Sequence, residues 1–110
     1  MSITMNLYYT GKDGNARKFV EEMEHSGTVD MIRAEVGNEK YDYYFSIDDP
    51  ETVLLIDSWK DQESLDAHHA SSMMETITAL REKYDLRMRA ERYVSDNGGI
   101  PDSDLKFIKK

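Results

Sequence analysis

An aspartate, a tryptophan and a histidine lie close together in the segment Val53–Ala70 of this 110-residue chain. The segment begins with an apolar run that predicts a strand, and Asp57 and Trp59 occupy alternate positions on one face of it. A short polar turn follows, and the next helix carries His68 about one turn after Leu65, on the side that turns toward the sheet. A carboxylate on so apolar a strand needs a partner or a pocket. We therefore predict a site at this strand–turn–helix junction.

His68 and Asp57 are the residues that we expect to do chemistry. Imidazole titrates near neutral pH, which suits proton transfer with an ionisable substrate, and a nearby carboxylate would orient the ring and raise its basicity. Adjacent helical residues point about 100° apart, so at most one of His68 and His69 faces the pocket. Surface or core packing is the alternative explanation for a lone histidine. A metal site is a further alternative, although two ligands are too few to build one.

The composition excludes several classes of protein and site. Because the chain has no cysteine, it forms no disulfide and no cysteine-ligated zinc or iron–sulfur centre. A formal net charge of −8 argues against nucleic-acid binding, which depends on neutralising phosphates. The sequence shows no phosphate-binding loop, no dinucleotide glycine motif, no signal peptide and no apolar run of membrane-spanning length. We expect a cytoplasmic protein that uses no bound cofactor and no metal.

Hydrophobic periodicity predicts two halves, each with the order strand, helix, strand. Alternating residues predict strands over residues 2–10, 41–47, 52–59 and 86–91. Helical periodicity predicts a first helix after the turn at residues 11–15, with a restart after Ser26-Gly27, and a second from about Glu63, loosened at Ser71-Ser72. The order β-α-β-β-α-β is that of a ferredoxin-like α+β fold, with helices on one face of a four-stranded antiparallel sheet.

The strand Thr52–Trp59 is apolar on both faces, but a chain of this size has helices for only one of them. We expect the other sheet face to pack against a second copy in a homodimer, because an exposed patch of that size usually meets a partner. A glycine- and proline-containing breaker at residues 97–101 separates a domain over residues 1–95 from a tail over residues 96–110. We expect the tail to dock on the domain or the partner subunit through Leu105, Phe107 and Ile108.

The sequence around this junction resembles the signature of the antibiotic biosynthesis monooxygenase (ABM) family. That signature has an acid-x-Trp pair at a strand end, an acidic turn and a Leu-x-x-His helix start, as in residues 55–68 here. The run Arg33-Ala34-Glu35-Val36-Gly37 resembles the family's second-strand region, and the likeness covers roughly residues 3–93. Two positions depart from the pattern: Asp57 stands where glutamate is commoner, and Met73 stands where many members carry a second histidine.

The resemblance implies a dimeric α/β barrel and a cofactor-free oxygenase that acts on quinols, anthrones or similar electron-rich phenols. A deprotonated substrate of this kind supplies the electrons and reacts with O₂ directly. The protein then needs a base, a dry apolar pocket and polar groups that steady the anion, with His68 as the base and Asp57 as its partner. Fold does not fix function, so a non-catalytic dimeric ligand-binding or stress-response module of the same fold is the alternative.

The candidate substrate-binding residues are Trp59, Asn6, Tyr44, Met73 and Met74. Trp59 is expected as a core anchor or as a pocket wall, and the two roles are compatible. Methionine suits a pocket for flat aromatic rings because it is flexible and its sulfur contacts rings favourably, although core packing is the commoner role of such methionines and tyrosines. The resemblance makes Asn6 a pocket candidate, whereas its position on the first strand also suits a solvated or interface face.

Overall fold

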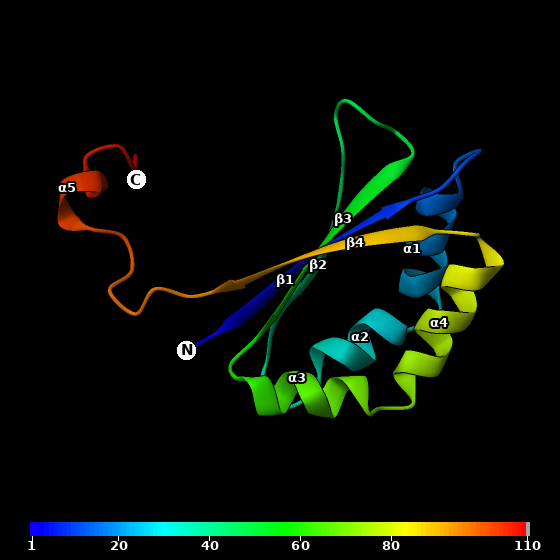
Figure 1. Cartoon of the computed structure of the whole chain (residues 1–110), viewed down its shortest axis with the longest axis horizontal. Helices are drawn as coiled ribbons and strands as arrows, with labels where there is room; N and C mark the ends of the chain where they lie inside the picture. The colour runs from blue at the N-terminus through cyan, green and yellow to red at the C-terminus, as the bar shows by residue number, and fades with distance from the viewer. Residues whose placement is uncertain (110) are drawn as a thin grey trace.

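A four-stranded antiparallel sheet with helices on one face forms the body of the chain in the computed structural model, which describes residues 1–109 (Figure 1). The strands are β1 (Ile3–Thr10), β2 (Asn38–Phe45), β3 (Thr52–Trp59) and β4 (Arg87–Val94), in the sheet order β2-β3-β1-β4. The helices are α1 (Asn15–His25), α2 (Thr28–Arg33), α3 (Gln62–His69), α4 (Met73–Lys83) and α5 (Asp102–Leu105). The predicted ferredoxin-like α+β fold is confirmed, with each predicted helical region divided into two helices.

The register of the sheet fixes which side chains of β3 meet the helices. Asp57 is paired with Met5 of β1 on one side and with Tyr41 of β2 on the other. Paired residues of neighbouring strands share a face, and this face also carries the fully buried side chains of Val53 and Trp59. The carboxylate therefore lies inside the core layer between sheet and helices.

The start of α3 is fixed by a side-chain cap. Asp61 has an extended backbone, and its Oδ1 accepts a hydrogen bond from the backbone N–H of Ser64 at 2.8 Å. Leu65 and His68, three residues apart on this helix, both turn inward and are buried. The loosening predicted near Ser71 is a complete break between α3 and α4, where the Ser71 hydroxyl donates to the His68 carbonyl at 2.7 Å.

The opposite face of the sheet has no helix over it within residues 1–109 (Figure 1). Leu54 and Ile56 of β3 lie on this face and are half-buried by the neighbouring strands. Polar contacts surround them: the Arg89 guanidinium lies 4.0 Å from the centre of the Tyr8 ring, and the hydroxyls of Thr10 and Thr52 are 2.9 Å apart. We call this surface the open sheet face.

The chain after β4 runs away from the sheet and the helices, so that α5 lies apart from the body (Figure 1). This helix buries no residue, and four large apolar side chains around it are exposed: Ile100, Leu105, Phe107 and Ile108. Docking of the tail, as predicted from the same side chains, would therefore have to use a partner subunit. None of the helices within residues 1–109 combines the length and the apolar character needed to cross a membrane.

Gly37 shapes the turn that leads from α2 into β2 and holds it against the start of α3. Its φ is +84°, and a Cβ at this position would lie 2.1 Å from Oγ of Ser64. Its carbonyl accepts a hydrogen bond from the backbone N–H of Lys60 at 2.8 Å. Both the left-handed backbone and the close approach of α3 therefore require glycine here.

The substitution Gly37→Ala should lower the free energy of unfolding by about 1–2 kcal/mol through the left-handed backbone alone, and by more because of the clash with Ser64. Urea denaturation measures the change. Adding Ser64→Gly removes the clashing side chain, so the double variant should lose less than the sum of the two single variants. An unchanged denaturation midpoint for Gly37→Ala would contradict the packing described here.

Candidate functional site

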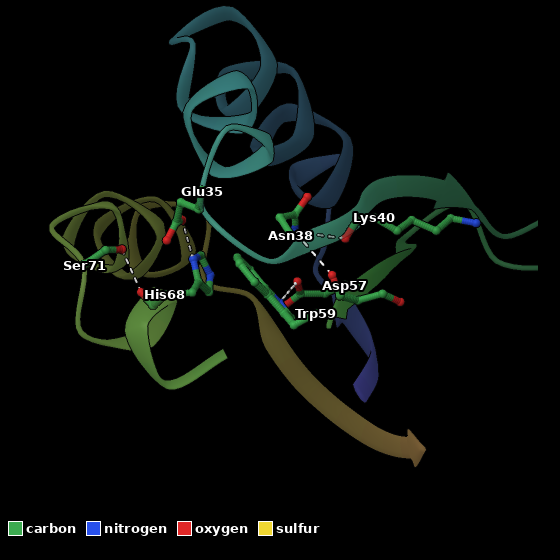
Figure 2. A network of polar contacts seen from close by, with 8 residues as sticks. Glu35, Asn38, Lys40, Asp57, Trp59, His68 and Ser71 are labelled. Atoms are coloured by element: carbon green, nitrogen blue, oxygen red, sulfur yellow. Dashed lines mark hydrogen bonds and ion pairs between the residues drawn. The ribbon is translucent and has the colours of Figure 1, made fainter. Parts of the chain in front are cut away.

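Asp57 and Trp59 are joined by a hydrogen bond on the helix-covered face of β3 (Figure 2). The indole Nε1–H of Trp59 donates to Oδ1 of Asp57 at 2.5 Å. Asp57 is only 3% exposed and Trp59 is fully buried. Residues that are two positions apart on a strand have their side chains on the same face, so this contact follows from the sequence spacing. The buried carboxylate thus receives a donor from its own strand.

His68 brings the imidazole of α3 against this pair. Its ring stacks on Trp59, with ring centroids 4.8 Å apart and planes inclined by 27°. His68 Nδ1–H donates to Oε1 of Glu35 at 2.8 Å, since an ionised carboxylate has no proton to give (Figure 2). The two side chains are 3% and 16% exposed. With Glu35 as the acceptor, the neutral ring carries its proton on Nδ1, while Nε2 has no hydrogen-bond partner within residues 1–109.

The surroundings of Asp57 raise the pKa of its carboxyl group toward neutral pH. Burial raises the pKa of Asp57 from 3.8 to about 6. The nearby His68 and the hydrogen bond from Trp59 oppose this rise in pKa, while the charge of Glu35 adds to it. A carboxyl group with such a pKa can hold or release a proton under physiological conditions, as proton-transfer chemistry requires.

A cavity of about 230 Å³ lies between α4, the end of α3 and the sheet. Apolar side chains make up half of its lining: Met5, Leu7, Met74, Ile77, Met88 and Ala90. The other half carries the polar groups: Tyr9, Tyr41, Asp57, His68, His69 and Arg81. An apolar enclosure with a few convergent polar groups is typical of a small-molecule site. Because an apolar cavity of ~150 Å³ accommodates benzene, this one has room for one or two fused aromatic rings.

Two buried tyrosines supply neutral hydrogen-bond groups to the cavity. Burial raises the pKa of Tyr9 to about 12, and it raises the pKa of Tyr41 well above its usual value. Both phenols are neutral at physiological pH, and both residues line the cavity.

The structure brings three of the predicted site residues to the cavity wall: Asp57, His68 and Met74. Trp59 lies behind them, where it supports Asp57 and His68 without contributing to the wall. Met73, next to Met74 on the helix, packs against the core outside the cavity lining. Adjacent helical residues diverge by about 100°, which accounts for the different surroundings of the two methionines.

Asn6 and Tyr44, the other two candidates, project from the open sheet face. Asn6 lies between Met5 and Leu7 on β1, whose side chains line the cavity on the opposite face. Its Oδ1 is buried and has no hydrogen-bond partner within residues 1–109. Tyr44 is exposed, and Lys40 Nζ lies 5.6 Å from its ring centroid. Within one chain the sheet separates both residues from the cavity, so their substrate contacts stay a prediction.

Glu35 and Arg81 are site residues that the sequence reasoning did not name. Glu35 lies 33 residues before His68, and no local spacing connects the two. A signal for Arg81 did exist, because it follows Ile77 by four residues and Met74 by seven, which places all three on one face of the helix. Within residues 1–109 no group of three or more His, Asp or Glu side chains converges as a metal site would require.

Comparison with known protein families gives one match that spans most of the chain. The family model described as "Antibiotic biosynthesis monooxygenase" matches residues 2–80. A protein of Bacillus subtilis (strain 168) with the name "Putative monooxygenase YcnE" is 25% identical over 77 residues, which cover 70% of this chain and 79% of the relative.

Solved structures share the fold. A conserved protein from Methanosarcina mazei Go1 superposes with a TM-score of 0.76 at 22% identity, covering 87% of this chain and 94% of that one. A mutant of SnoaB, described as a cofactor-independent oxygenase from Streptomyces nogalater, superposes with a TM-score of 0.72 at 12% identity, covering 86% and 92% of the two chains. At these identities the likeness establishes the common fold.

The raised pKa of Asp57 predicts a pH-dependent cost of folding. The protonated carboxyl is favoured in the folded chain relative to the unfolded one. The free energy of unfolding is therefore highest below pH 3.8, and it falls as the pH rises through 6. Relative to Asp57→Asn, whose amide oxygen can still accept from Trp59, the wild type should lose up to roughly 3 kcal/mol between pH 4 and pH 7. Denaturant unfolding of both proteins across this range measures the difference. A difference that does not change with pH would contradict the prediction.

Proposed function

Because the chain belongs to the antibiotic biosynthesis monooxygenase family, we propose that it is a cofactor-independent monooxygenase that oxidises a small aromatic phenol or quinol with O₂. The observation that carries the proposal is the cavity beside α4, where Asp57 and His68 stand in a largely apolar wall. The name of the Bacillus subtilis relative and the fold shared with SnoaB support the same class of chemistry.

His68 acts as the general base in this proposal. Glu35 holds the proton on Nδ1, so the free Nε2 takes the phenolic proton of the substrate. The imidazolium that forms is stabilised by Glu35 and by the nearby Asp57, and Trp59 keeps the ring in place from behind. These contacts pre-orient the base before the substrate arrives.

The phenolate then supplies the electrons for the reaction with O₂. One oxygen atom bonds to a ring carbon, and the other leaves as water with the hydrogens of the phenol and of that carbon, which converts the phenol into a quinone. The apolar wall keeps bulk water away from the anion, and the neutral phenols of Tyr9 and Tyr41 donate hydrogen bonds to it. The cavity volume of about 230 Å³ favours one or two fused rings over larger polycyclic substrates.

Dihydroxynaphthalenes should give oxygen uptake above their own autoxidation without added metal or flavin, and anthrones should give less because they are larger. The substitution His68→Ala should lower the rate by about 10²–10⁴-fold, since it removes the general base. An oxygen electrode measures both. The control is His25→Ala, which changes an exposed histidine of α1 and should leave the rate unchanged.

Uptake that survives His68→Ala would remove His68 from the mechanism. Binding of aromatic ligands without any oxygen uptake would instead favour a ligand-binding module of the same fold.

We infer in addition that two chains pair through the open sheet face. This face carries the half-buried Leu54 and Ile56 and the exposed Tyr44, and within residues 1–109 no helix covers it. A second copy would shield these side chains from water. The apolar side chains of the tail would gain a surface to dock on in the same assembly.

The wild type should sediment as a dimer at micromolar concentration, and Ile56→Lys should sediment as a folded monomer because it places a charge in the paired face. The matched control is Met31→Lys, which adds the same charge to an exposed apolar position of α2 and should leave the dimer intact. A chain ending at residue 100 should dimerise less tightly if the tail contributes. A stable, folded wild-type monomer at micromolar concentration would defeat the proposal.

A further inference from the structure

We infer that Arg81 makes the cavity selective for aromatic ligands that carry a carboxylate or a similar anionic substituent. The inference deepens the proposed function and rests on it for the use of this cavity as a ligand site. Arg81 belongs to the stripe of α4 that also presents Met74 and Ile77 to the cavity. Among the cavity-lining residues of the described range 1–109, Arg81 is the one with a positively charged arginine or lysine side chain.

The guanidinium of Arg81 has no anionic partner of its own. Arg33 pairs with Asp42 and Arg89 with Glu91, but Arg81 forms no ion pair with the Asp and Glu side chains of residues 1–109. Among the described residues 1–109, its hydrogen-bond partner is the sulfur of Met88 at 3.8 Å, a weak acceptor on the same cavity wall. A half-buried guanidinium with five donors is better satisfied by a carboxylate, which it can bind through two parallel hydrogen bonds.

Tyr9 lines the cavity together with Arg81 and Asp57. The positive charge of Arg81 lowers the pKa of this phenol, against the effect of burial, and the negative charge of Asp57 raises it. Tyr9 is therefore within electrostatic reach of both groups. A ring system lying along Tyr9 can present its phenol to Asp57 and His68 and its anionic substituent to Arg81.

The overall charge of the chain makes a local cation necessary for such a ligand. With a formal net charge of −8, the protein as a whole repels anions. Asp57 and Glu35 add negative charge close to the cavity. An anionic aromatic would therefore bind here only through a specific interaction, which Arg81 supplies.

The test compares two ligands with one ring system, 6-hydroxy-2-naphthoic acid and its carboxamide, by calorimetry without oxygen. The wild type should bind the acid at least about tenfold more tightly than the amide, because a charge-assisted pair is stronger than a neutral hydrogen bond. Arg81→Met keeps an apolar side chain and should bring the ratio of the two affinities to about one. Arg81→Lys should retain part of the preference, since the charge remains but the planar fork does not.

Lys18→Met is the matched control, because it makes the same change in net charge at an exposed position of α1. It should leave the ratio of the two affinities unchanged. Unaltered binding of the amide shows that Arg81→Met is folded, and a thermal melt gives a second check.

Equal affinity of the wild type for the two ligands would overturn the inference, as would a preference that persists in Arg81→Met or no binding of the acid at millimolar concentration. The measurement needs no turnover. A preference for the acid without oxygen uptake would support the role of Arg81 and contradict the proposed oxygenase activity. Oxygen uptake without the preference would support the oxygenase activity and contradict the role of Arg81.

Discussion

A carboxylate in the middle of an apolar strand must find hydrogen-bond donors where water cannot reach, and this requirement organises the structure around Asp57. The donor is Trp59, two residues further along the same strand face. The indole is then the surface on which His68 stacks, and the imidazole in turn donates to Glu35. Two hydrogen bonds and one ring stack thus link the four side chains, and this chain of contacts holds its members in one arrangement. Asp57 and His68 meet the cavity from this fixed support.

Two acids and one imidazole lie close together here, and the pKa of Asp57 depends on the other two groups. Burial raises the pKa of Asp57, while the nearby His68 lowers it. If His68 gains a proton from a ligand, its positive charge favours the ionised form of Asp57 and stabilises the pair. Glu35 binds the opposite side of the imidazole, so the ring keeps its orientation through the change. The site can therefore accept a proton without rearranging the core, which is the property that proton abstraction from a phenol needs.

Local periodicity was sufficient to predict the fold and the inward placement of Asp57 and His68, and the family resemblance is confirmed. The alternation of β3 placed Asp57 beside Trp59, and the interval from Leu65 turned His68 inward. Glu35 could not be found in this way, because its contact depends on how the turn at Gly37 packs against α3. Met73 and Met74 were both candidates, and only Met74 lies in the cavity lining, because the break after α3 resets the helical phase and the stripe of α4 is not continuous with that of α3. Asn6 came from the resemblance, whereas the alternation of β1 assigns it to the open sheet face.

The cavity and the open sheet face are two sides of the same strands. Met5 and Leu7 of β1 line the cavity, while Asn6 between them projects from the other face. β1 is paired along its length with β3, which carries Asp57, and with β4, which carries Met88. The floor of the cavity is therefore built from strands whose opposite side chains would meet a second copy. β4 is an edge strand with exposed residues on both faces, and β1 is its one neighbour in the sheet within residues 1–109. Packing of a partner against the open face would fix the position of β4 and with it the width of the cavity. Dimer formation would in this way act directly on the shape of the site.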